Sequence, residues 1–206
     1  MLVLDPLKKN NLKIASKLLK YGYLVAFPTE TVYGVGCVYD NFNAYKKLNI
    51  LKKRSENKPY TFMLSKFSDI NKYAIFSNKK IKKFLKKILP GPITVILPAK
   101  KSVPSNLICN KTIGIRIPKC KIILKIIDFI NKAILAPSLN ISGQKPLNSI
   151  DEIKKNFDNQ IKAIVKTNTI LSDKASTIIT FENDKIRVLR HGKISSSVLE
   201  RIYDNT

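Results

Sequence analysis

Short apolar segments alternate along this chain with longer segments of helical period, and this alternation constrains the fold more than any other feature of the sequence. Several apolar segments end in proline, glycine or small polar residues, as buried strands often do. The pattern predicts strands at residues 23–27, 60–64, 93–97, 112–117, 133–136, 161–165, 176–181 and 185–189. It predicts helices at residues 10–21, 42–53, 78–89, 120–131, 149–157 and 195–203. With a hairpin across residues 182–184, this order predicts an α/β fold with a mixed sheet.

Specific residues mark two of the helix boundaries. Gly22 follows the first predicted helix and is expected to stop it. Ser149 and Glu152 have the spacing of a capping box, in which the two side chains satisfy free N–H groups of the first helical turn. We therefore expect Ser149 to cap the helix that runs to Phe157.

A chain of 206 residues can form one sizeable core, and we expect a single domain over residues 1–206. No apolar run is long enough for a membrane span, and an acid and a proline come too early at the N-terminus for a secretory signal. The cysteines are far apart and lack metal or redox spacing; they are Cys37, Cys109 and Cys120. We therefore expect a cytoplasmic protein with no membrane partner.

The formal net charge of +24 has two interpretations. A large positive field attracts nucleic acid or nucleotides. Heavy use of lysine together with isoleucine and asparagine is also what an AT-rich coding sequence produces, and this favours a solvated lysine surface. The helix at residues 78–89 fits the second interpretation, since its apolar residues form a stripe of ordinary core width. Only five of the 38 basic residues are arginine, which suggests that each arginine is needed for its planar donor fork.

Several kinds of chemistry are not supported by the sequence. The one histidine, His191, cannot form a histidine-rich metal site and is expected to be an ordinary loop residue. No P-loop or Rossmann glycine motif occurs, and the 14 acids are spread thinly. The remaining candidates are hydroxyl, amide and cationic donors.

The stretch "FPTETVYGVG", residues 27–36, places small hydroxyl residues around Glu30 directly after a predicted strand. Strand ends in α/β proteins are where ligands usually bind. Further donors follow other predicted strands and one helix: Lys52, Lys53, Arg54, Lys58, Thr112, Arg116, Ser138, Asn140, Ser142, Ser176, Thr177 and Arg190. Singly each is explained by a turn, a cap or a core position. Together they indicate a concave site suited to polyanion binding and phosphoryl or nucleotidyl transfer.

Seven blocks in order, "FPTETVYGVG", "KKRSENKP", "PGPITVIL", "TIGIRIP", "APSLNISG", "STIIT" and "VLRHGKI", resemble the YrdC-like family of threonylcarbamoyl-AMP synthases, over about residues 10 to 195. The length resembles the short, single-domain form. The resemblance implies an open, twisted mixed sheet with flanking helices and a concave basic cavity. It implies synthesis of threonylcarbamoyl-AMP from L-threonine, bicarbonate and ATP with release of pyrophosphate, the first step of threonylcarbamoyladenosine modification of tRNA. A tRNA threonylcarbamoyl-transfer complex would be the downstream partner, with possible direct tRNA contact.

The same resemblance assigns site residues. Lys52 and Arg54 are implied as the catalytic pair on the ATP phosphates. The threonine site is implied at Thr31, Arg116, Ala136 and Ser176, and the nucleotide site at Lys52, Arg54, Lys58, Thr112, Ser138, Asn140 and Arg190. No metal ligand is implied, and Mg²⁺ would be bound mainly through the phosphates. The chain departs from the family at Met63, where many relatives have histidine, and at His191 within the last block.

Two other functions stay open at this point. A tRNA- or double-stranded-RNA-binding protein on the same fold, without synthase activity, is compatible with the charge. The sequence shows no aromatic stacking platform for RNA, which counts against it. A paralogue with another carbamoyl or phosphate reaction is the third interpretation, and the intact Lys-x-Arg and Ser-x-Asn blocks favour the synthase over it.

Overall fold

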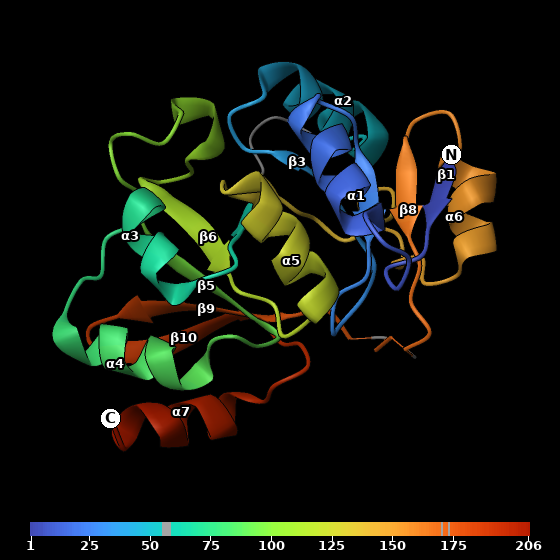
Figure 1. Cartoon of the computed structure of the whole chain (residues 1–206). Helices are drawn as coiled ribbons and strands as arrows, with labels where there is room; N and C mark the ends of the chain where they lie inside the picture. Colours follow the sequence, from blue (N-terminus) through green and yellow to red (C-terminus); the bar gives the residue numbers. More distant parts are fainter. Residues whose placement is uncertain (55–58, 170, 173) are drawn as a thin grey trace.

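The computed structural model describes residues 1–54, 59–169, 171–172 and 174–206. Within these residues the strands form one open sheet with the order β1-β8-β2-β3-β7-β4-β6-β5-β9-β10 (Figure 1). The strands are β1 (Leu2–Leu4), β2 (Val25–Phe27), β3 (Gly34–Val38), β4 (Thr61–Met63), β5 (Ile93–Pro98), β6 (Thr112–Arg116), β7 (Ile134–Leu135), β8 (Ala163–Val165), β9 (Thr177–Glu182) and β10 (Lys185–Arg190). The α-helices are α1 (Asn11–Lys20), α2 (Phe42–Lys52), α3 (Ile70–Tyr73), α4 (Lys79–Ile88), α5 (Lys121–Ile130), α6 (Ile150–Phe157) and α7 (Ser196–Asp204), with short 3-10 helices at Phe67–Asp69 and Ser105–Leu107.

The sheet is mixed, as the sequence predicts. Strand β8 pairs in parallel with β1 and β2, and the pairs β4–β6 and β5–β9 are also parallel. The other neighbours are antiparallel. The two halves of the sheet meet at β3, whose first part pairs with β2 and whose last two residues pair with β7. The α/β fold predicted from the alternating segments is therefore confirmed.

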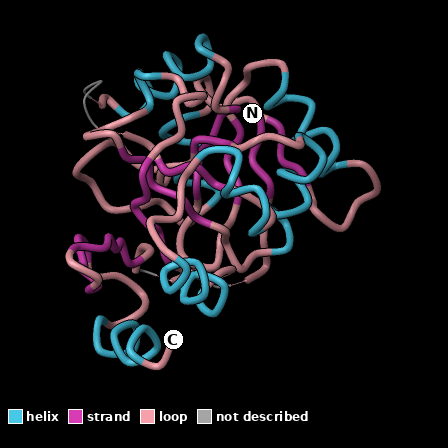
Figure 2. Tube along the Cα trace, turned by 90° about the vertical axis from the view of Figure 1, so that its left-hand side faces the viewer, coloured by secondary structure: helices cyan, strands magenta, loops and turns pink. Residues whose placement is uncertain are grey.

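The helices cover the sheet with their apolar faces. Helix α1 packs against α5, and α4 packs against α7 near the β9–β10 hairpin (Figure 1). Figure 2 shows from a second direction that the C-terminal helix lies at one end of the molecule, away from the N-terminus. The stripe predicted for α4 is buried, and it consists of Ile81, Phe84, Leu85 and Ile88. The lysines of α4 are exposed, as expected of a surface helix. Over the described residues, no helix combines the length and the hydrophobicity that a membrane span requires.

Strand β3 was not predicted, because two glycines interrupt its apolar pattern. The structure explains these glycines by close contacts. A Cβ on Gly34 would lie 2.8 Å from the Phe27 ring, and one on Gly36 would lie 2.9 Å from the carbonyl oxygen of Leu135. The neighbouring strands therefore leave no room for a side chain here.

The predicted capping box at Ser149 is wrong in its hydrogen bonds. Ser149 occupies the N-cap position of α6, but its side chain makes no capping hydrogen bond. Its carbonyl oxygen accepts the N–H of Ile153, which is the first ordinary bond of the helix, and two acids in the first turn meet the positive end of the helix dipole. True side-chain caps occur at Asn41 and Asn78, whose Oδ1 atoms accept from Ala44 N and Ile81 N. Gly22 follows α1 with a φ of 79°, as expected of a helix stop.

Candidate functional site

A cavity of about 160 Å³ lies where the ends of several strands meet the loops that follow them. Its walls come from the loop after β2, from residues around β4, from the start of β5 and β9, and from the ends of β6 and β10. The described residues that line it are Thr29, Thr31, Val32, Tyr33, Gly34, Arg54, Pro59, Tyr60, Thr61, Met63, Thr94, Arg116, Ala136, Pro137, Ser138, Ala175, Ser176, Ile178 and Arg190.

The loop after β2 folds into a hydroxyl-stabilised turn. The Oγ1 of Thr29 donates to the carbonyl of Val32 at 2.7 Å and accepts the N–H of Thr31 at 3.1 Å. Because its one proton is used in this way, the 2.8 Å contact between the two threonine hydroxyls uses the proton of Thr31. Thr31 is fully buried, and its oxygen is left with acceptor capacity only.

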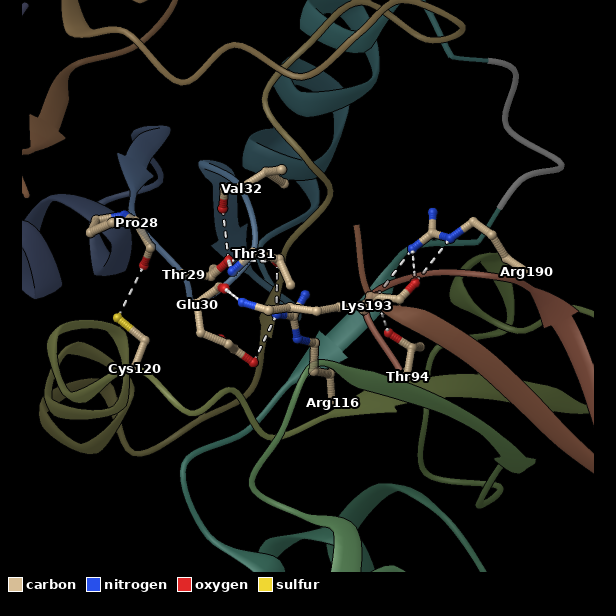
Figure 3. A network of polar contacts seen from close by, with 11 residues as sticks. Pro28, Thr29, Glu30, Thr31, Val32, Thr94, Arg116, Cys120, Arg190 and Lys193 are labelled. Carbon is tan, nitrogen blue, oxygen red and sulfur yellow. Dashed lines mark hydrogen bonds and ion pairs between the residues drawn. The ribbon is translucent and has the colours of Figure 1, made fainter. Parts of the chain in front are cut away.

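Arg116 ends β6 and points toward this loop (Figure 3). Its Nη2 donates to Thr31 Oγ1 at 3.0 Å and lies 3.1 Å from Glu30 Oε1. The Nε of Arg116 and both carboxylate oxygens of Glu30 are buried and have no hydrogen-bond partner among the described residues, so the contact with Glu30 is an ion pair without hydrogen-bond geometry. Arg116 therefore brings an incompletely hydrogen-bonded guanidinium to the wall of the cavity, and such a group favours a bound anion.

Arg190 ends β10 and holds the opposite wall of the cavity (Figure 3). Its Nε and Nη2 donate to the carbonyl oxygen of Ser176 at 3.2 and 2.8 Å, and Nη2 also donates to Ser176 Oγ at 3.1 Å. The Ser176 hydroxyl lies 3.0 Å from the hydroxyl of Thr94. Burial, and then the charge of Arg116, lowers the pKa of Arg190. On this wall, Arg190 therefore holds the Ser176 hydroxyl in place beside the hydroxyl of Thr94.

Residues 191–193 continue from Arg190 across the site. A Cβ on Gly192 would lie 2.4 Å from the Ala175 oxygen and from the Thr177 nitrogen, so only glycine fits there. Lys193 reaches the loop after β2, where its Nζ donates to the carbonyl of Glu30 at 3.0 Å. This segment ties the two walls of the cavity together.

Lys52, the last residue of α2, lies behind the cavity wall rather than in it. Its side chain is 2% exposed. Its Nζ donates to the Ser138 carbonyl at 2.7 Å, to Asn140 Oδ1 at 2.8 Å and to the Asn140 carbonyl. Burial, and then the charge of Arg54, lowers the pKa of Lys52 to about 8.

Arg54, two residues after the end of α2, lines the cavity. Its Nη2 donates to the carbonyl of Pro59 at 2.8 Å, and its guanidinium lies 4.6 Å from the centre of the Tyr60 ring. These contacts hold a cation over an aromatic face beside the cavity. Lys58, also predicted as a nucleotide ligand, lies outside the described residues.

Most of the predicted site residues lie together. Those that line the cavity are Thr31, Arg54, Arg116, Ala136, Ser138, Ser176 and Arg190. Lys52 and Asn140 are not among the described lining residues, but they contact Ser138 from behind. Thr112 is at the opposite end of β6 from Arg116, where its hydroxyl donates to the carbonyl of Cys109 at 2.8 Å.

The sequence motifs assign no roles to Thr94, Tyr60 and Lys193. A threonine inside the otherwise apolar strand "ITVIL" was the available signal for Thr94. Nothing local distinguishes Lys193 from the other lysines, because its contact with Glu30 is made across 163 positions of the chain. Met63, noted as a departure from the related sequences, does line the cavity.

An open mixed sheet with a cavity of hydroxyls and fixed arginines at its strand ends is typical of an α/β protein that binds small anionic ligands. A sequence model of the Sua5/YciO/YrdC family, described as telomere recombination, matches residues 17–192. The chain belongs to this family.

Individual relatives support the same assignment. The threonylcarbamoyl-AMP synthase of Wigglesworthia glossinidia brevipalpis is 36% identical over 159 residues, which cover 75% of this chain and 81% of that protein. The enzyme of the same name from Pyrococcus abyssi is 29% identical over 201 residues, 97% of this chain. The crystal structure of P. abyssi Sua5 complexed with L-threonine superposes with a TM-score of 0.90 at 28% identity over 98% of this chain. The chain spans only 59% of the P. abyssi protein and 60% of that crystallised chain.

Proposed function

We propose that this protein is a threonylcarbamoyl-AMP synthase, which joins L-threonine, bicarbonate and ATP and releases pyrophosphate. The observation that carries the proposal is the buried, unpartnered Nε of Arg116, on a residue that lines the cavity and contacts Thr31. Relatives with this name support it. They do not favour the alternative of an RNA-binding protein without synthase activity.

Threonine would be oriented by the division of the cavity into donors and acceptors. The guanidinium of Arg116 would pair with the threonine carboxylate, which is its usual partner. Thr31 Oγ1 has acceptor capacity only and would accept a hydrogen bond from an N–H of the threonine amine. The Thr94–Ser176 hydroxyl pair and Ala136 would complete the pocket around the threonine side chain.

ATP would lie on the side of the cavity formed by Arg54, Ser138 and Arg190. The family motifs imply Lys58 and Thr112 as further nucleotide ligands, and Thr112 would have to reach ATP from the opposite end of β6, where its hydroxyl donates to the carbonyl of Cys109. No group of three or more His, Cys, Asp or Glu residues that could hold a metal occurs among the described residues. Mg²⁺ would arrive on the ATP phosphates, where it would neutralise charge.

The reaction needs little acid–base chemistry from the protein. Bicarbonate takes up a proton and loses water to give carbon dioxide, and the neutral amine of threonine adds to its carbon. The proton that the nitrogen then loses replaces the one consumed, so threonine and bicarbonate give a carbamate and water. A carbamate oxygen then attacks the α-phosphorus of ATP, the bond to the bridging oxygen breaks, and pyrophosphate leaves with its electron pair. Arg54 would stabilise negative charge on the transferring and leaving phosphates, and the pocket would hold the carbamate in line. The product would pass to a transfer complex that modifies tRNA.

The test is pyrophosphate release from ATP by the purified protein, with threonine and bicarbonate omitted in turn. We expect release only when both are present, together with a product that contains AMP, carbonate carbon and threonine. Release without threonine would point to another nucleotide reaction. Salt-sensitive tRNA binding without threonine-dependent ATP use would support the RNA-binding alternative.

A further inference from the structure

The ammonium group of Lys52 uses all of its protons inside the protein. A lysine ammonium has three donors and no acceptor. Its three acceptors here are the carbonyl oxygens of Ser138 and Asn140 and the Oδ1 of Asn140. Lys52 is 2% exposed and all three of its donors are satisfied. In this arrangement its ammonium group therefore has no proton left for a phosphate.

The Asn140 amide is used up in the same way. Its Oδ1 accepts from Lys52 Nζ and, at 2.7 Å, from Ser138 Oγ. Its Nδ2 donates to the carbonyls of Ile141 and Gln144 at 2.9 and 2.6 Å. The side chain therefore shapes the segment around it and offers no free donor to a ligand.

The end of α2 is bound to this segment through its backbone as well. The carbonyl oxygen of Lys52 accepts the N–H and the hydroxyl of Ser142, at 3.0 and 2.8 Å. The carbonyl groups at the C-terminal end of a helix also favour a cation close by. Among the residues that this network joins, Ser138 lines the cavity.

We propose that Lys52 is a positioning residue, whose ammonium cross-links the end of α2 to residues 138–142 and so fixes the wall of the cavity that faces the nucleotide. Arg54, two positions further on, lines the cavity and supplies the charge that meets the phosphates. The identity of the ligand as a nucleotide rests on the proposed function, whereas the cross-link itself does not.

The first measurement is the hydrogen exchange of residues 138–142 in the ligand-free protein. Lys52→Met keeps an unbranched side chain of similar size and removes all three donors. The matched control is Lys46→Met, which removes an exposed lysine from the same helix. We expect faster exchange in this segment for Lys52→Met and unchanged exchange for Lys46→Met. Unchanged exchange in Lys52→Met would overturn the proposal.

The second measurement is calorimetric titration with ATP and with AMP. A cross-link that shapes the wall affects both ligands, so we expect Lys52→Met to weaken both by the same factor, roughly tenfold or more for hydrogen bonds to a charged group. Asn140→Ala removes the cross-link from its other side. The fold-loss of nucleotide affinity in the double variant should therefore be smaller than the product of the fold-losses in the two single variants. Loss of ATP affinity with AMP affinity intact would mean direct contact with the outer phosphates and would overturn the proposal.

The two arms separate the proposal from the proposed function. If the wild-type protein binds neither nucleotide, the synthase assignment fails, and the exchange measurement still decides whether the cross-link exists. If Lys52→Met does not fold, Asn140→Ala carries the same exchange and titration experiments.

Discussion

Arg116 shows how much of the site depends on the geometry of single residues. Its Nη2 is held by Thr31 and by the charge of Glu30, while its Nε has no partner in the described part of the chain. A planar fork can be anchored on one side and offer a donor on the other, which a lysine ammonium at the end of a flexible stem cannot reproduce.

Arg116→Lys should therefore weaken threonine binding and leave ATP binding intact. The loss of a buried, charge-assisted hydrogen bond is worth about 1.5–3 kcal/mol, or on the order of ten- to a hundredfold in affinity. Calorimetric titration with each ligand measures this. The control is Arg187→Lys, since Arg187 is an exposed arginine paired with Glu182. Equal threonine affinity in the two variants would contradict the role of Arg116.

Arg54→Ala should have the opposite selectivity. Arg54 lines the cavity on the proposed phosphate side, so its loss should weaken ATP binding and slow pyrophosphate release even at saturating threonine. The same titrations, combined with a pyrophosphate assay, test this. If Arg54→Ala and Arg116→Lys lost the same ligand, the division of the cavity into threonine and nucleotide sides would be wrong.

The pKa of Lys52 predicts a pH dependence of stability. Burial holds this pKa at about 8, below the ordinary lysine value of 10.5. Between these values the unfolded chain binds a proton that the folded protein does not, so the free energy of unfolding rises with pH across this window. Chemical denaturation at about pH 7.5, 9 and 10.5, which spans this window, gives the difference in the free energy of unfolding between the wild type and Lys52→Met. A wild-type advantage that shrinks as pH rises would contradict the lowered pKa.

Among the structural elements, the segment from Arg190 to Lys193 joins both walls of the cavity. It binds Ser176 through Arg190 and the loop after β2 through Lys193. Gly192 passes so close to the backbone of residues 175–177 that a Cβ has no room. The position of Ser176 therefore depends on a glycine that contributes no side chain to the site.

Gly192→Ala should push this segment away from Ser176. Overpacking against backbone atoms typically costs about 1–3 kcal/mol, so we expect a lower midpoint of denaturant unfolding. Threonine affinity should fall too, because the Thr94–Ser176 pair loses its support. An unchanged unfolding midpoint would show that the segment is not tightly packed in solution.

The elements of the fold differ in how well the sequence predicts them. Helices such as α4 and α5 have apolar residues at helical spacing, and their ends were predicted to within a residue or two. Strand β3 was missed because Gly34 and Gly36 are required by contacts with β2 and β7, which a local pattern does not show. In the site, the motifs indicated which residues gather. They did not indicate that Lys52 turns toward a segment 86 positions away, because a lysine stem adopts many directions.

For the whole molecule, the excess of positive charge should make stability depend on salt. With a formal net charge of +24, the positive side chains repel one another in the compact folded state, and salt screens this repulsion. The screening length falls from about 10 Å at 0.1 M to about 3 Å at 1 M. We therefore expect the free energy of unfolding by urea to rise with sodium chloride over this range. A fall would mean that favourable ion pairs outweigh the repulsion.

The cavity is assembled from parts of the chain that are made at very different times. Its walls include residues from Thr29 to Arg190, and β5 must wait for β9 before the wall that bears Ser176 can form. A chain growing from its N-terminus on the ribosome folds its early parts first. The cavity therefore closes only after Arg190 has been synthesised, so the pocket proposed for threonine and ATP is complete only near the end of synthesis.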